Sequence, residues 1–348
     1  MFSKLKLAAL VTIFCVIQTA REVKTSRGQH DSSVLNRQIL RKWLAEAPEN
    51  HAPEAISDVL AELSHGPSLK TRLREDLRQK LGNIEDLPES FDARQKWKHC
   101  KHLIGAVHNQ GPCKSDYAIV AASVLADRLC IQSNGKFKDM LSAQKILECY
   151  GSCKFGGFMW DTFEYLNKTG TTTGGLYQSE EGCVPFKPQP CSHRGNDRMM
   201  ASDGDLPDCS TLPSREYNWC DKKCTNENYD KKFTEDIHKT AKFGWAPTNA
   251  KKLQTEIYVN GSVAAGFTMY DDFRGYESGV YNKSSNAGYE GSHKVKLIGW
   301  GIEDDGTPHW LAVNSFGKEW GLQGLFKFPR GRNYYFIESL GIKVTPQL

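Results

Sequence analysis

The sequence predicts an α+β fold in which helices come first along the chain and strands come last. Residues 117–131 are apolar at nearly every position, which is typical of a helix buried on all sides. Residues 295–301 and 310–314 have the composition of strands, and a turn-rich stretch at 303–308 lies between them. Because the helical and extended segments occupy different parts of the chain, we expect two halves packed against each other.

Length and composition permit two halves of ordinary size. The chain has 348 residues, and about 150 residues per domain is a common size. Hydrophobic residues make up 39% and charged residues 25%, which excludes a disordered or fibrous protein. The 45 basic and 41 acidic residues are too evenly balanced for a protein that coats nucleic acid.

Residues 1–20 are typical of a secretory signal peptide. Lys4 and Lys6 precede an apolar run at 7–17. This run is too short for a membrane span, which needs roughly 20 apolar residues, and no later run is long enough either. We therefore predict the secretory pathway, with an extracellular destination (for example the gut lumen) or a lysosomal one. The predicted glycosylation sites are Asn167, Asn260 and Asn282.

Residues 21–86 contain no cysteine and carry apolar residues at helical intervals. The clearest stripe is Leu69, Leu73, Leu77 and Leu81. We predict a helical prosegment that covers or chaperones the domain behind it, residues 87–348. An ordinary N-terminal helical subdomain is the alternative.

The chain has eleven cysteines, and an odd number suggests one unpaired thiol. Cys15 lies inside the predicted signal peptide, so its removal leaves ten cysteines that can all pair. The ten histidines include no HisGluXxxXxxHis pattern, and no phosphate-binding glycine loop is present. We expect no metal and no cofactor.

Several ordered segments resemble the papain-type cysteine proteases, and within them cathepsin B. These segments are residues 87–94, 109–113, 174–177, 276–281, 297–301 and 314–321. The resemblance runs from about residue 87 to about residue 338. It implies a papain-like two-lobed fold, with a helical lobe at about 101–240, a β-rich lobe at about 241–340 and a cleft between them.

The resemblance also implies the catalytic residues. In this family a cysteine at the start of a buried helix attacks the peptide carbonyl, because the helix N-terminus and a nearby imidazolium keep it as a thiolate. His293 matches the family's histidine, Asn314 the asparagine that orients it, and Gln110 the glutamine that binds the oxyanion.

Asp116 stands at the position of the reactive cysteine. Residues 113–117 read CysLysSerAspTyr, where the family has CysGlySerCysTrp or a close variant. A carboxylate is already ionised at neutral pH, so the histidine has no proton to remove from it. We expect little or no thiol-protease activity, with Asp116 capping the helix and forming an ion pair with His293. Attack by Cys113 or Ser115 instead is the alternative.

The resemblance further implies five disulfides and a set of residues in the cleft. The pairs are Cys100 with Cys130, Cys113 with Cys153, Cys149 with Cys220, Cys183 with Cys224, and Cys191 with Cys209. Gly156 and Gly157 match glycines that let a substrate backbone lie close. His193 and Arg194 lie where cathepsin B has the histidines of its occluding loop. Arg194 either binds a carboxylate or belongs to a solvated loop without that role.

The resulting prediction is a secreted, catalytically inactive cathepsin B homologue that binds peptides or protease inhibitors. Its partners are peptides, protein substrates or inhibitors and its own prosegment, and we expect a monomer. One alternative is an active or residual cysteine-type endopeptidase or dipeptidyl carboxypeptidase. The other is a structural or storage protein of the secretory route.

Overall fold

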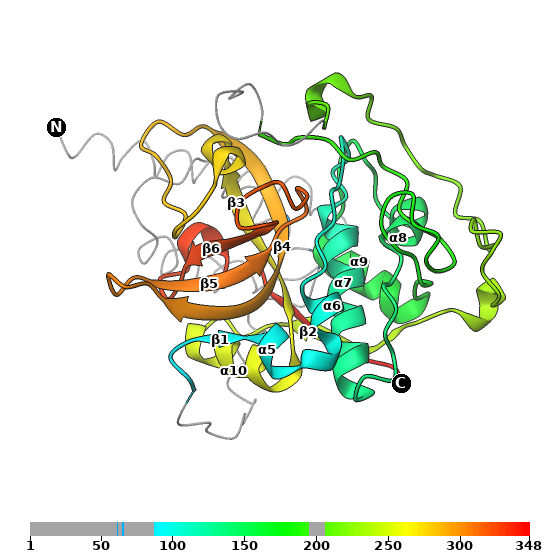
Figure 1. The fold of residues 1–348 in the computed structure, drawn as a ribbon, viewed down its shortest axis with the longest axis horizontal. Helices are drawn as coiled ribbons and strands as arrows, with labels where there is room; N and C mark the ends of the chain where they lie inside the picture. Colours follow the sequence, from blue (N-terminus) through cyan, green and yellow to red (C-terminus); the bar gives the residue numbers. More distant parts are fainter. Residues whose placement is uncertain (1–60, 62–64, 66–86, 195–205) are drawn as a thin grey trace, which may run out of the picture.

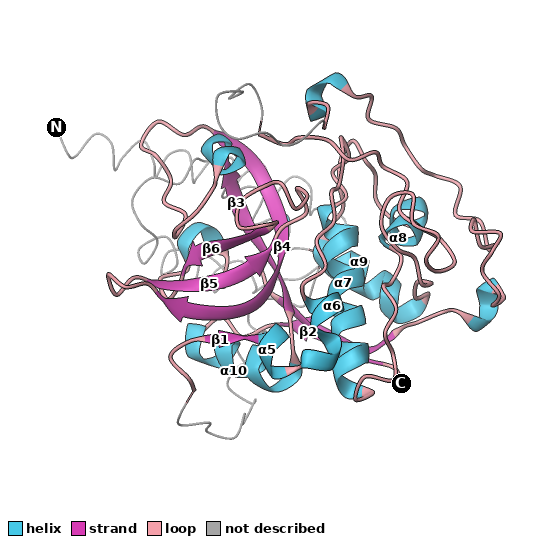
Figure 2. Ribbon diagram, in the orientation of Figure 1, coloured by secondary structure: helices cyan, strands magenta, loops and turns pink. Residues whose placement is uncertain are grey.

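A computed structural model describes residues 61, 65, 87–194 and 206–348 of the protein. The predicted signal peptide, Cys15 and the leucine stripe of the prosegment lie outside the described residues. Ala61 and His65 are the two described residues of the predicted prosegment. In Figures 1 and 2 the strands gather on one side and helices α6 to α9 on the other.

The described helices fall mainly in the first half of the described chain. They are α5 (Ala93–Lys96), α6 (Lys101–Ile104), α7 (Asp116–Gln132), α8 (Ala143–Cys149), α9 (Met159–Lys168) and α10 (Ala250–Asn260). The described strands are β1 (Phe91–Asp92), β2 (Thr240–Trp245), β3 (Val263–Tyr270), β4 (Tyr289–Ile302), β5 (Pro308–Val313), β6 (Leu325–Pro329) and β7 (Ile342–Pro346). The α+β fold that the sequence predicts is confirmed.

Helix α7 is the central helix, and it begins at Asp116 as the apolar run predicts. Its side chains are buried around nearly the whole circumference, from Asp116 to Cys130. A helix that is apolar all round must be covered on every side. Helices α6, α8 and α9 and strands β4 and β7 provide that cover.

The strands form one antiparallel sheet in the order β2-β7-β3-β4-β5-β6, and β1 pairs with β4. Strand β4 has 14 residues and is longer than the predicted strand at 295–301. Its first part contains glycine and polar residues, yet its backbone pairs with β3, and His293 lies opposite Phe267. Pairing between strands therefore extends β4 beyond what composition indicates, and it carries His293 into the sheet.

Buried ion pairs join α7 to the sheet side. Lys296 Nζ of β4 lies 3.0 Å from Asp127, and both side chains are almost fully buried. Arg128 lies 3.0 Å from Glu256 of α10 and also donates to the carbonyl of Val344 in β7 at 2.7 Å. A buried charge needs a partner, so these contacts fix the position of α7 against three other elements.

Five disulfides hold the described chain together. They are Cys100–Cys130, Cys113–Cys153, Cys149–Cys220, Cys183–Cys224 and Cys191–Cys209. These are the pairs that the resemblance implies. All ten cysteines in the described part of the chain are therefore bonded.

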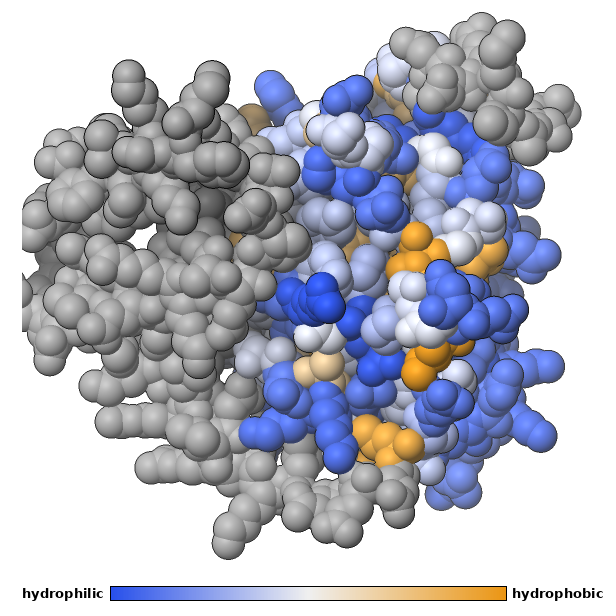
Figure 3. Space-filling model, turned by 90° about the vertical axis from the view of Figure 1, so that its left-hand side faces the viewer, coloured by the Kyte–Doolittle hydropathy of each residue, from blue (hydrophilic) through white to orange (hydrophobic). Residues whose placement is uncertain are grey.

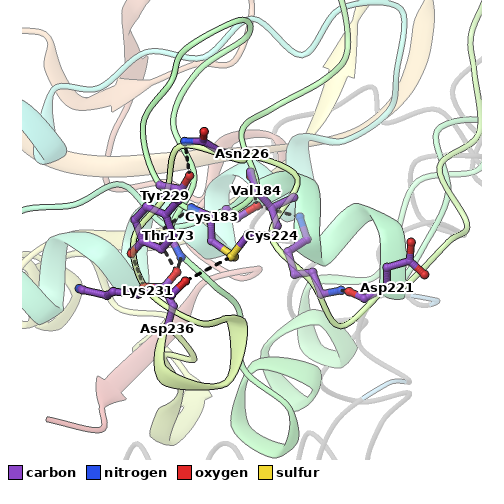
Figure 4. Close-up of a disulfide and its surroundings, with 12 residues drawn as sticks. Thr173, Cys183, Val184, Asp221, Cys224, Asn226, Tyr229, Lys231 and Asp236 are labelled. Carbon is purple, nitrogen blue, oxygen red and sulfur yellow. Dashed lines mark hydrogen bonds between the residues drawn. A yellow bond between two sulfur atoms is a disulfide. The ribbon is translucent and has the colours of Figure 1, made fainter.

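Figure 4 shows how one disulfide is supported by polar contacts. Next to Cys183–Cys224, the buried carboxylate of Asp236 accepts hydrogen bonds from the Thr173 backbone N–H at 2.8 Å and the Tyr229 hydroxyl at 2.7 Å. These bonds tie the long irregular segment before β2 onto the helical half.

No helix among the described residues is long and apolar enough to cross a membrane. On the face seen in Figure 3, hydrophilic side chains cover most of the described surface, and hydrophobic ones stand in small groups.

Candidate active site

The start of α7 and the middle of β4 bring Asp116 and His293 together. Asp116 follows a turn whose Gly111 has a φ of +63°, a left-handed conformation that favours glycine. Oδ2 of Asp116 lies 3.1 Å from Nδ1 of His293. Their exposed fractions are 6% and 3%, so water hardly reaches the pair.

The Asp116 carboxylate is fully engaged by its surroundings. Oδ2 also accepts from the Lys294 backbone N–H at 2.8 Å, and Oδ1 accepts from the Tyr117 backbone N–H at 2.9 Å. Burial by itself would raise the pKa of this carboxyl. The hydrogen bond from His293 and the charges of Lys294 and His293 outweigh burial and lower the pKa to about 2. The group is therefore an anion at neutral pH.

Asp116 lies inside the first turn of α7, one residue beyond the N-cap position. The N-cap is Ser115, whose side chain makes no capping hydrogen bond. The expectation that Asp116 is the helix cap is therefore wrong, and Oδ1 of Asp116 instead accepts from the backbone N–H of the next residue. A negative charge in the first turn is also favoured by the helix dipole.

His293 is held between two acceptors. Its Nε2 lies 2.8 Å from Oδ1 of Asn314, and that oxygen also accepts from the Ser315 backbone N–H at 2.8 Å. Carboxylate and amide oxygens only accept hydrogen bonds. Each ring nitrogen of His293 therefore faces an oxygen acceptor, Asp116 at Nδ1 and Asn314 at Nε2.

Gln110 lies beside this pair and is held by its own hydrogen bonds. Its Oε1 accepts from the Ser315 hydroxyl at 2.6 Å, and its Nε2 donates to the Cys113 carbonyl at 2.9 Å. The structure thus connects Gln110, Asn314, His293 and Asp116 in one continuous hydrogen-bonded group.

Gly156 and Gly157 lie beside the start of α7. A Cβ on Gly157 would stand 2.7 Å from the ring of Tyr117, and Gly156 has a φ of +78°. Packing against Tyr117 therefore requires a glycine at 157 whether or not a peptide binds there.

His193 is buried near the site rather than presented on a loop surface. Its ring stacks on Phe316 with centroids 4.3 Å apart, and the same Phe316 ring lies 4.9 Å from that of His293. Burial and the nearby Arg274 and His293 charges lower the pKa of His193 to about 3. His193 is therefore neutral. Phe316, which connects the two histidines, was not singled out from the sequence.

Arg194, for which the sequence left both a carboxylate contact and a solvated loop open, is engaged by neighbouring groups of the protein. Its side chain is 11% exposed, its Nη1 lies 3.3 Å from Glu277, and its Nη2 donates to the Glu319 carbonyl at 2.9 Å. The carboxylate that meets Arg194 in this structure comes from the protein itself.

Comparisons with known proteins identify the family of the chain. The model for "Papain family cysteine protease" matches residues 87–345. The chain belongs to the papain family. It is a cathepsin B-like homologue. It is 34% identical over 314 residues to "Cathepsin B-like cysteine proteinase 4" of Caenorhabditis elegans, which covers 88% of this chain and 89% of the relative.

A second relative and a solved structure are similar to the chain over most of its length. The chain is 32% identical over 340 residues to a "Gut-specific cysteine proteinase" of Caenorhabditis elegans, covering 96% of this chain and 95% of the relative. Among solved structures it is similar to procathepsin B S9 from Trypanosoma congolense, with a TM-score of 0.61 and 28% identity over 79% of this chain and 80% of the other.

For a member of the papain family, the location of any free thiol decides what chemistry is open to it. Cys113, three residues before Asp116, is bonded to Cys153, and Ser115 is fully buried. Cys191, His193 and Cys209 come close enough together to resemble a metal site. The two sulfurs are bonded to each other, however, and a metal-binding cysteine must be a free thiolate.

Proposed function

We propose that this cathepsin B-like homologue has no thiol-protease activity and binds peptides or protease inhibitors instead. The observation that carries the proposal is the 3.1 Å contact between Asp116 and His293 at the start of α7. A papain-type reaction needs a thiolate and an imidazolium in this arrangement. In this chain the carboxylate of Asp116 and the imidazole ring of His293 form the corresponding pair.

A carboxylate in this position is unsuited to peptide hydrolysis. With a pKa of about 2, Asp116 is ionised before it meets a substrate, so His293 cannot activate it by taking a proton. Both of its oxygens already accept hydrogen bonds. Loss of the nucleophile from a protease triad lowers kcat by a factor on the order of 10⁶ in a serine protease.

Retention of the surrounding residues supports a binding role. Gln110, Asn314 and Phe316 remain buried and fixed by contacts around the pair. Arg194 already meets Glu277, so we propose that it does not hold the terminal carboxylate of a bound peptide.

The proposal includes a secretory route. Five disulfides are typical of proteins that fold in an oxidising compartment, and such a route agrees with a signal peptide at 1–20 and a prosegment at 21–86. The name of the gut-specific relative suggests the gut lumen as one destination, with the lysosome as the other.

Labelling with a thiol-reactive epoxide inhibitor of cysteine proteases tests the loss of the nucleophile. We expect no adduct by mass spectrometry on the wild-type domain after residues 1–86 are removed. The variant Asp116→Cys should take up one inhibitor molecule. An adduct on the wild-type domain would support a peptidase with residual activity.

A binding measurement separates the remaining alternative. Fluorescence anisotropy with a panel of labelled peptides should detect binding to the wild-type domain, and a papain-family inhibitor protein should compete with it. Absence of any binding would favour the structural or storage function.

A further inference from the structure

We propose that Cys191, His193 and Cys209 bind a zinc ion once the disulfide between the two cysteines has been reduced. While the disulfide is intact, its sulfurs cannot bind a metal, because a zinc-binding cysteine is a thiolate. The disulfide and the zinc site are therefore two alternative states of the same residues. This proposal goes beyond the function proposed above and does not depend on it, since it involves neither a peptide nor catalysis.

The structure brings three ligand atoms into one place. The sulfurs of Cys191 and Cys209 and a ring nitrogen of His193 all lie within 4.8 Å of one another. In a tetrahedral zinc site, with bonds of about 2.0 to 2.3 Å, neighbouring ligand atoms are about 3.5 to 3.8 Å apart. Shifts of about 1 to 2 Å would produce this arrangement once the sulfurs are no longer bonded. Within the described residues, no other three histidine, cysteine or acidic side chains come this close.

The backbone holds the two cysteines side by side without help from the disulfide. The Ser192 backbone N–H donates to the Pro207 carbonyl at 2.8 Å. The Cys209 backbone N–H donates to the Ser192 carbonyl at 3.0 Å, and Ser192 and Asp208 form a parallel bridge. Both thiols therefore stay close together after reduction, so binding a metal costs little further loss of chain entropy.

The His193 ring is fixed by contacts that do not involve the sulfurs. It stacks on Phe316 with centroids 4.3 Å apart and 12° between the ring planes, and its Nε2 lies 3.3 Å from Oδ1 of Asn109. The side chain of Asn109 also donates to the Cys191 carbonyl at 2.8 Å. A histidine that binds a metal is commonly oriented by a second polar group in this way. Asn109 therefore positions two of the three ligands.

The kind of ligand selects the metal. Two thiolates and one imidazole suit zinc, whereas calcium and magnesium require oxygen ligands. The two thiolate charges also balance the charge of Zn²⁺. This balance matters because Arg274 lies nearby and donates to the His193 carbonyl at 3.3 Å. The three protein ligands leave the fourth position of the zinc ion to a water molecule.

The reduction requires a low-molecular-weight thiol. Two molecules of this thiol are oxidised to their own disulfide, and Cys191–Cys209 takes up the two electrons and two protons and becomes two thiols. Zn²⁺ then displaces one proton from each thiol as the zinc–sulfur bonds form. In a reducing environment, zinc thus replaces the disulfide as the cross-link between residues 191 and 209.

The first test measures how zinc protects individual cysteines from alkylation. The full-length chain with Cys15→Ser is reduced with a phosphine and treated with iodoacetamide, with or without Zn²⁺, and peptide mass spectrometry follows each cysteine. We expect zinc to slow alkylation of Cys191 and Cys209 by at least about 10-fold and to leave the exposed Cys220 unprotected. Equal alkylation of Cys191 and Cys209 with and without zinc overturns the proposal.

Two variants make this test specific to the histidine. His193→Phe keeps a ring that can stack on Phe316 but removes the nitrogen ligand, so zinc should bind at least about 10-fold more weakly and the protection should be lost. The matched control is His99→Gln, at an exposed histidine next to Cys100 of another disulfide, and it should be protected like the wild type. The proposal is overturned if zinc protects the two variants equally.

The second test needs no variant at the site. Co²⁺ added to the reduced full-length chain with Cys15→Ser should produce a sulfur-to-cobalt charge-transfer absorption at one Co²⁺ per chain, and Zn²⁺ should displace it. Reoxidation with oxidised glutathione should abolish the absorption, because the disulfide forms again. Lack of this absorption in the reduced chain, or its presence in the unreduced chain, overturns the proposal.

Discussion

Oδ2 of Asp116 contacts Nδ1 of His293 at 3.1 Å, and Nε2 of the same ring contacts Asn314 at 2.8 Å. This line of carboxylate, imidazole ring and amide runs from α7 through β4 to the residue after β5. Since every member is buried, the line joins the helical half to the sheet half through polar groups that satisfy each other. In this chain the group that resembles a catalytic centre stabilises the contact between the two halves.

We predict that Asp116→Asn weakens the protein in a pH-dependent way. The pKa of Asp116 is about 2 in the folded protein, below its ordinary value of 3.8. A lowered pKa contributes stability above the unfolded value, on the order of 2 kcal/mol here, and this contribution is lost as pH falls from about 4 to about 2. Urea unfolding of both proteins across this range measures the difference.

The matched control is Asp230→Asn, at an exposed aspartate. Its difference from the wild type should be small and independent of pH. A constant difference for Asp116→Asn between pH 7 and pH 2 would contradict the ion pair.

We predict that Lys296→Met costs about 3 to 5 kcal/mol in the free energy of unfolding, because it leaves Asp127 buried without a counter-charge. The double variant with Lys296→Met and Asp127→Leu should recover most of this loss, since it removes both charges. Chemical denaturation of the three proteins tests this. If the double variant is as unstable as the single one, the loss of stability does not come from an unpaired charge on Asp127.

We predict that Gly157→Ala destabilises the fold by about 1 to 3 kcal/mol, because the new methyl group would stand 2.7 Å from the Tyr117 ring. Gly275→Ala is the control, since a Cβ at this position meets nothing within 4 Å. It should change stability by less than about 0.5 kcal/mol. Equal melting temperatures for the two variants would show that Tyr117 does not restrict position 157.

We predict that Asn282 carries a glycan when the protein is made in a secreting eukaryotic cell. Asn282 is exposed, whereas Asn167 uses its Nδ2 to donate to the Thr240 carbonyl at 2.7 Å and Asn260 is partly buried. The mobility shift on enzymatic deglycosylation should disappear in Asn282→Gln. It should persist in Thr169→Val, which removes the Asn167 sequon, and a full shift in Asn282→Gln would refute the prediction.

Local pattern and resemblance were enough for several parts of the fold. The apolar run at 117–131 predicted α7, because a helix covered on all sides needs no polar face. The ordered segments around Gln110, His293 and Asn314 implied that these residues meet, and the structure brings them together with Asp116.

Other features depend on partners that are distant in the sequence. Asp127 and Arg128 stood out only as polar residues in an apolar run, and the partner of Asp127 lies 169 residues away. The contact between Arg194 and Glu277 spans 83 residues, so no local pattern signals it. The first part of β4 was missed because pairing with β3, rather than its own composition, makes it extended.

Peptide hydrolysis by the Asp116→Cys variant tests the central claim most directly. With residues 1–86 removed, we predict that this variant cleaves a fluorogenic peptide at least on the order of 10³-fold faster than the wild type. The gain should vanish with an epoxide inhibitor and in the variant that also carries His293→Ala. Two results would contradict the claim that the substitution by Asp116 abolishes catalysis. One is epoxide-sensitive cleavage by the wild type at the same rate as by Asp116→Cys, and the other is a cleavage rate that does not rise in Asp116→Cys.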